Sequence, residues 1–126
     1  MSNNDLAPKM IALIHQHSAV DAIYLYGSRA KGIAREDSDW DIGVLFQTYL
    51  NDVLEAHARP QALEAMLQKQ LKHYDKISVV DVELVQPALQ YNIICGDVWY
   101  DKNVPHVKRF ENAVISKIEK DYRYGT

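Results

Sequence analysis

The segment GSRAKGIAREDSDWD at residues 27–41 constrains the fold most strongly, because it joins two apolar runs that are each long enough for one strand. The first run, residues 23–26, ends at Gly27, and the second, residues 42–46, follows Asp41 directly. Short runs of branched and aromatic residues bounded by glycine and polar residues are typical of strands. The segment therefore predicts a polar turn between two neighbouring strands.

Two acids open the second of these strands. Successive side chains of a strand alternate between its faces, so Asp39 and Asp41 are expected on the same face, roughly 6 to 7 Å apart. Carboxylate oxygens are the ligands that Mg²⁺ prefers, and two of them can share one divalent cation. An Asp-x-Asp pattern is by itself common in turns and surface strands, so it predicts a metal site only together with its surroundings.

The other end of the segment has the features of a phosphate-binding turn. Gly27 lets the backbone approach a phosphate without a Cβ in the way, and Ser28 is a short hydroxyl that can cap a helix. If a short helix starts at Ser28, its free amides face the phosphates, and Arg29 and Lys31 add positive charge. The conjunction of this turn with the two acids favours a nucleoside triphosphate bound with magnesium over an ordinary turn.

These residues resemble a known signature. The stretch from Tyr24 to Phe46 is similar to the polymerase-β-type nucleotidyltransferases, and the chain resembles their minimal nucleotidyltransferase (MNT) group. Ser38 fits the usual Ser-Asp-x-Asp form. Trp40 stands where a smaller aliphatic residue is more usual and is expected to reshape the wall of the site. The resemblance implies a polymerase-β-like α/β (α+β) fold, a small mixed sheet flanked by helices, and ATP as nucleotide donor.

The resemblance also implies a third acid on a later strand. Residues 77–85, ISVVDVELV, are rich in β-branched residues and predict that strand. A period of two places Asp81 and Glu83 together on one face of it. By resemblance Asp81 is the better match and Glu83 the alternative. An ordinary half-buried strand with a solvated acidic face is the other interpretation of the same pattern.

The implied chemistry is a nucleotide transfer that uses two magnesium ions. Asp39 and Asp41 would hold both ions, and Asp81 would complete the second site. Asp81 or a metal-bound hydroxide would take the proton of the acceptor hydroxyl. The side chains of the preceding turn, Ser28, Arg29 and Lys31, would steady the departing pyrophosphate.

The MNT group further implies a toxin–antitoxin context. The expected partner and substrate is a HEPN-domain ribonuclease toxin, with AMP transferred from ATP to one of its tyrosines, so that the chain acts as antitoxin. Two alternatives stay open. One is a small-molecule nucleotidyltransferase similar to the aminoglycoside-modifying enzymes. The other is a non-catalytic antitoxin that binds and masks its toxin.

The remaining periodicity predicts strands alternating with helices in a single domain covering residues 1–126, which is an α/β pattern. Residues 51–74 are helical in pattern but contain Pro60, which either breaks them into two helices or opens the second one. The other expected helices and strands are an opening helix at 6–17, a strand at 22–26, a strand at 40–47, a helix from Pro87 to Gly96, a short edge strand at 97–101 and a final helix beyond Pro105.

Composition limits the partners and the compartment. The net charge of −3 and the absence of a Lys/Arg run argue against direct binding of a nucleic-acid backbone. Cys95 is the only cysteine, so an intrachain disulfide is impossible and a reducing, cytoplasmic location is expected. No apolar run approaches the ~20 residues of a membrane span, and no signal peptide is expected.

Overall fold

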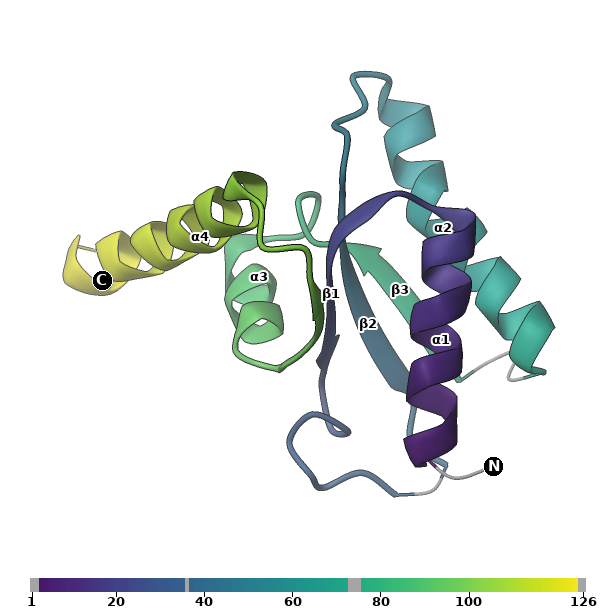
Figure 1. Ribbon diagram of the computed structural model, residues 1–126. Coiled ribbons are helices and arrows are strands. Elements are labelled where there is room, and N and C mark those ends of the chain that lie inside the picture. The colour runs from purple at the N-terminus through teal and green to yellow at the C-terminus, as the bar shows by residue number, and fades with distance from the viewer. Residues whose placement is uncertain (1–2, 36, 73–75, 125–126) are drawn as a thin grey trace.

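The computed structural model describes residues 3–35, 37–72 and 76–124, which form one mixed sheet with two helices on each face (Figure 1). The sheet has the strand order β3-β2-β1-β4. The strands are β1 (Val20–Tyr26), β2 (Trp40–Phe46), β3 (Ile77–Asp81) and β4 (Asp97–Asp101). The helices are α1 (Asn3–His17), α2 (Val53–Leu71), α3 (Pro87–Ile94) and α4 (Pro105–Tyr124). The predicted α/β fold with a small mixed sheet flanked by helices is confirmed.

The sheet separates two apolar clusters. Helices α1 and α2 cover one face, where Met10, Ile14 and Leu67 are fully buried against β1 and β2. Helices α3 and α4 cover the other face, where Ile93 and Phe110 pack against Tyr24 and its neighbours. From residue 22 of β1 and along β2, successive residues alternate between these clusters, as the period of two requires, and a bulge between Val20 and Ala22 shifts the pattern at the start of β1. Each strand therefore contributes to both cores, and a one-residue change of register would exchange the faces.

Strand directions decide where the polar turn lies. β1 pairs antiparallel with β2 and with β4, whereas β2 pairs parallel with β3. The end of β1 and the starts of β2 and β3 therefore lie at the same edge of the sheet. The connection from Gly27 to Asp39 runs along this edge, at the bottom of the view in Figure 1.

The predicted break at Pro60 is wrong, because α2 runs as one helix from Val53 to Leu71 through the proline. Asp52 caps its start by accepting a hydrogen bond from the Glu55 amide at 3.0 Å. Pro60 removes a single backbone donor and is itself buried. The apolar face of α2 continues on both sides of the proline, with Ala56, Leu63 and Leu67 buried. Burial of this face offsets the missing hydrogen bond.

Two other boundaries differ from the prediction. β3 ends at Asp81 and not at residue 85, because the Leu84 amide donates to the Asp81 carbonyl at 3.0 Å and turns the chain. The opening helix begins at Asn3, three residues before the predicted start. The edge strand at 97–101 and the helices after Pro87 and Pro105 are confirmed. None of the helices in the described ranges is both long and apolar enough to cross a membrane.

Candidate active site

The structure places Asp39 and Asp41 at the edge where β2 begins. Asp39 is the residue just before β2 and is exposed, whereas Asp41 is the second residue of β2 and is partly buried. Burial raises the pKa of Asp41, and the negative charge of Asp39 raises it further. A carboxylate whose ionisation is disfavoured by a neighbouring negative charge is stabilised by a bound cation. The electrostatics of the pair thus suit the binding of a divalent ion.

Gly27 lies directly against this pair. Its φ of +76° is in the left-handed region, and a Cβ built there would overlap Oδ2 of Asp41. The positive φ favours glycine at this position, and any larger residue would also have to displace the Asp41 carboxylate. The end of β1 therefore lies close against the carboxylate of β2.

The residues after Gly27 form a turn and not the predicted short helix. The Lys31 amide donates to the Gly27 carbonyl at 3.2 Å and the Ile33 amide to the Ser28 carbonyl at 3.2 Å, but Gly32, with φ +74°, ends the helical geometry. The Ser28 amide has no acceptor among the described residues. Unpaired amides in such a turn form a concave surface that suits an anion.

Arg29 has a different position from the one expected for a phosphate ligand. Its Nε and Nη2 donate to the Ser38 carbonyl at 3.1 and 2.7 Å, and its guanidinium stacks over the Trp40 ring at 4.1 Å. These contacts hold the residues on either side of Asp39. Trp40 itself is buried in the core under α1, on the opposite face from Asp41, so it does not form the expected wall of the site.

Lys31 is exposed and Ser28 is partly exposed, both on the turn beside the carboxylates. Their contact with a triphosphate stays a prediction. Within the described part of the chain, neither side chain forms a hydrogen bond or ion pair with another residue. They are therefore free to meet a ligand in a way that the Arg29 guanidinium, which is held by the protein, is not.

The structure does not bring Asp81 to the pair. Asp41 is level with Ser78 on β3, and Asp81 is level with Val44, three residues farther along. Three residues correspond to about 10 Å of strand and reverse the face on which the side chain lies. The expectation that Asp81 completes the metal site is therefore corrected: this carboxylate lies on the α2 face of the sheet.

Asp81 has partners of its own there. It is 3% exposed, and its Oδ2 lies 3.4 Å from Nη2 of Arg59. Arg59 stacks over Phe46 at 4.0 Å and donates to the Thr48 carbonyl at 2.9 Å. Burial raises the pKa of Asp81, although the Glu83 amide and Arg59 both act to lower it. The contacts indicate a structural role at the ends of β2 and β3.

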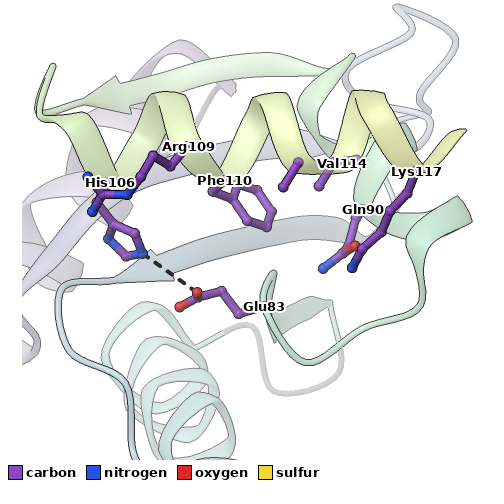
Figure 2. Close-up of a pocket in the computed structure, with 8 residues that line it drawn as sticks. Glu83, Gln90, His106, Arg109, Phe110, Val114 and Lys117 are labelled. Atoms are coloured by element: carbon purple, nitrogen blue, oxygen red, sulfur yellow. Dashed lines mark ion pairs between the residues drawn. The ribbon is translucent and has the colours of Figure 1, made fainter. Parts of the chain in front are cut away.

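Glu83, the alternative third acid, does not share a strand face with Asp81 but lies in the turn after β3. Its Oε2 is 3.6 Å from Nε2 of His106 (Figure 2). The other ring nitrogen of His106, Nδ1, lies 2.7 Å from Oδ2 of Asp21. Glu83 also lines a pocket of about 330 Å³ beneath α4, with Gln90 opposite. This pocket contains neither Asp39 nor Asp41, so Glu83 also lies outside the candidate active site.

Two neighbours of Asp41 were missed in the sequence. Tyr26 on β1 and Ser78 on β3 are its partners across the sheet. Burial and then the charge of Asp41 raise the pKa of Tyr26 to about 12, which keeps the phenol neutral and able to donate. Neither residue has a local motif, because its position depends on the register of two strand pairs. The short connection between β1 and β2 could have suggested that Tyr26 pairs with Asp41, but nothing local in the sequence indicates Ser78.

The side chains at this site can be set against the ligands that magnesium prefers. Within the described residues no group of three His, Cys, Asp or Glu side chains is close enough to hold a metal ion. Asp39 and Asp41 remain, and Mg²⁺ is usually bound by one or two carboxylates together with waters and substrate phosphates. The residues present therefore fit one magnesium ion that a bound triphosphate would help to hold.

The comparison with known families agrees with this geometry. The family model described as polymerase beta, nucleotidyltransferase matches residues 8–104. The match begins within α1 and continues past β4, so it contains the turn, both carboxylates and all four strands. No curated protein sequence matches the chain significantly.

Solved structures show the same fold. A toxin–antitoxin structure with AMP-PNP has 22% identity and a TM-score of 0.72, over 90% of this chain and 87% of that one. A tri-AMPylated Shewanella oneidensis HEPN toxin in complex with MNT antitoxin has 19% identity and a TM-score of 0.70, over 94% and 88%. A structure described as a minimal nucleotidyltransferase has 29% identity and a TM-score of 0.53, over 75% and 88%.

Proposed function

The chain belongs to the polymerase beta nucleotidyltransferase family, and from this premise we propose that it is a magnesium-dependent protein adenylyltransferase. Its proposed reaction transfers AMP from ATP to a tyrosine of a HEPN ribonuclease toxin, so that the chain acts as an antitoxin. The observation that carries the proposal is the contact between the Gly27 turn and Asp41. It joins a phosphate-binding turn to a metal-binding pair within one site.

The choice of donor and acceptor is supported by similar structures. One of them is a toxin–antitoxin with AMP-PNP, an analogue of ATP. Another is a tri-AMPylated HEPN toxin with an MNT antitoxin, which associates this fold with AMP on a HEPN protein. A phosphate-bearing nucleotide on a toxin would add bulk and negative charge where an RNA substrate approaches.

Each part of the site has a distinct task in this reaction. Asp39 and Asp41 would hold magnesium, which neutralises charge on the triphosphate and on the leaving pyrophosphate. The turn amides, the Ser28 hydroxyl and Lys31 would orient the β- and γ-phosphates, while Arg29 keeps the Asp39 segment in place. The exposed side of Asp39 leaves room for the acceptor.

The bonds exchanged are those of a nucleotidyl transfer. The tyrosine oxygen forms a bond to the α-phosphorus, and the bond from this phosphorus to the bridging oxygen of the β-phosphate breaks. Pyrophosphate leaves, and the phenolic proton passes to water at the open side of the site. Asp81 takes no part as a base, because it lies on the other face of the sheet.

The test is intact-mass spectrometry of a co-expressed HEPN-type neighbour, after incubation with this chain, magnesium and each of the four nucleoside triphosphates in turn. We expect a gain of one or more AMP units with ATP only, and no gain with the Asp39→Asn/Asp41→Asn variant. Adenylation of a cationic small molecule without any protein partner would instead support the small-molecule alternative. A stable complex that neutralises the toxin without a mass gain would support masking and contradict the proposal.

A further inference from the structure

One row of side chains crosses the sheet at the level of Asp41. Tyr26 on β1 and Ser78 on β3 are its register partners, and residues paired across strands project to the same face. Ser78 is partly exposed, so its hydroxyl is accessible from solvent. β3 therefore offers a single side chain to the face and level of the carboxylate pair, and that side chain is neutral.

We propose that Ser78 is the third side chain of the ion site, and that its neutral hydroxyl limits the free protein to weak binding of one divalent ion. The inference rests on the proposed function, since it takes Asp39 and Asp41 as the ion-binding pair. Two carboxylates and one hydroxyl supply a charge of −2, which balances a single divalent cation. A second ion then has to arrive with the triphosphate, whose oxygens supply the missing ligands and charge.

The acids around β3 are held elsewhere and leave this position to Ser78. Asp81 pairs with Arg59 on the opposite face. Glu83 faces His106 beneath α4, as Figure 2 shows. Glu64 of α2 accepts the Val79 amide at 2.8 Å along the free edge of β3. Within the described ranges, no third carboxylate is therefore available beside Asp41, in agreement with the absence of a three-residue metal cluster there.

The substitution Ser78→Asp tests the assignment by adding the missing charge. Binding of Mn²⁺, followed by the loss of the free-ion EPR signal in the absence of nucleotide, is expected to tighten by about tenfold, because affinity at oxygen sites follows the number of charged ligands. Gln47→Asp is the matched control. It adds the same charge just beyond the other end of β2, at an exposed position, and is expected to leave Mn²⁺ binding unchanged.

A second variant keeps the test valid if Ser78→Asp does not fold. Ser78→Cys differs from the native side chain by one atom, and is made in a Cys95→Ser background so that it has the only thiol. Cd²⁺ bound by a thiolate gives an ultraviolet charge-transfer band. We expect this band in Ser78→Cys and its loss when Asp39→Asn and Asp41→Asn are added, because the ion must touch all three positions.

The outcomes separate this inference from the function on which it rests. If Ser78→Asp binds Mn²⁺ no more tightly than Gln47→Asp, while binding still requires Asp39 and Asp41, the ion site stands and the assignment of Ser78 is overturned. A Cd²⁺ band that persists without the two carboxylates overturns it as well. If neither the wild type nor Ser78→Asp binds Mn²⁺ without nucleotide, and neither retains the Mn²⁺–ATP complex in equilibrium dialysis, the proposed magnesium-dependent function fails together with the inference.

Discussion

Asp41 and Asp81 lie on adjacent parallel strands and are both buried enough to raise their pKa, yet their surroundings differ. Asp81 has a cation, Arg59, and an amide donor from Glu83, all within the protein. Asp41 has a second carboxylate, Asp39, and a glycine pressed against it. The acid with an internal cation and an amide donor has its hydrogen-bonding partners within the protein, whereas the acid beside another acid is suited to a cation from outside.

The arginines near these two acids, Arg59 and Arg29, also differ in what they bind. Arg59 stacks on Phe46 and binds the carboxylate of Asp81, so it neutralises the acid that it reaches. Arg29 stacks on Trp40 and donates to the Ser38 carbonyl, so it holds the chain next to Asp39. The first arrangement completes a structural ion pair. The second holds the backbone on either side of Asp39, the acid assigned to the ligand.

The largest effect is expected when the functional pair is neutralised. Asp39→Asn/Asp41→Asn should lower the rate of nucleotide transfer by at least about a thousandfold, because the metal supplies several kcal/mol of charge stabilisation. The melting temperature should not fall, since the two charges disfavour each other. Single-turnover kinetics and thermal melts measure the two effects. Transfer at the wild-type rate would contradict the assignment of these acids.

A smaller loss of activity is expected from Gly27→Ala. The added Cβ overlaps Oδ2 of Asp41, and displacing a reactive group by about 1 Å can cost a hundredfold in rate. Gly32→Ala is a matched control, because Gly32 has nearly the same φ, +74°, but no atom within 4 Å of the added Cβ. Both variants should lose about 1 to 2 kcal/mol of stability from backbone strain. Equal rates for the two would show that the contact with Asp41 is unimportant.

Asp81→Ala is expected to lower stability without lowering the rate of nucleotide transfer. Removing this carboxylate leaves the Glu83 amide and Arg59 without their acceptor, which is expected to lower the free energy of unfolding by about 2 kcal/mol. Asp81→Asn keeps one oxygen acceptor and should lose less. Denaturant unfolding measures the change, and the rate of transfer by the folded variant should match the wild type. A folded Asp81→Asn that has lost transfer would remove the distinction between the two acids.

The smallest expected effect is a pH dependence of stability. Folding raises the pKa of Asp41 through burial and the charge of Asp39, so the folded state binds this proton more readily than the unfolded state. Stability from this group therefore falls as the pH rises through its folded pKa. Without metal, Asp41→Asn should be more stable than the wild type at neutral pH. The difference should disappear below about pH 4, where an ordinary aspartate is protonated. A difference that does not change with pH would contradict the raised pKa.

Prediction from the sequence placed the strands correctly where the interactions are local. Strands β1 and β2 both lie within residues 20–46, and the assignment of Asp39 and Asp41 as a metal pair stays a prediction. The third acid failed because it depends on how β3 aligns with β2, a pairing of segments more than thirty residues apart. Three positions along the strand separate Ser78 from Asp81, so the two side chains lie on opposite faces of the sheet, and only the register of β3 on β2 shows which of them is level with Asp41. Pro60 failed for a related reason, since burial of the helix against the sheet outweighs its local preference.

The sequence by itself determined the order of helices and strands, the mixed α/β class and the acidic turn, because each of these depends on residues that are neighbours along the chain. The tertiary structure alone decided that Asp81 pairs with Arg59, that Glu83 pairs with His106, and that Ser78 lies beside Asp41. Side-chain alternation makes the face of a residue depend on the parity of the strand register. That register is set by the packing of both cores at once, and no short motif records it.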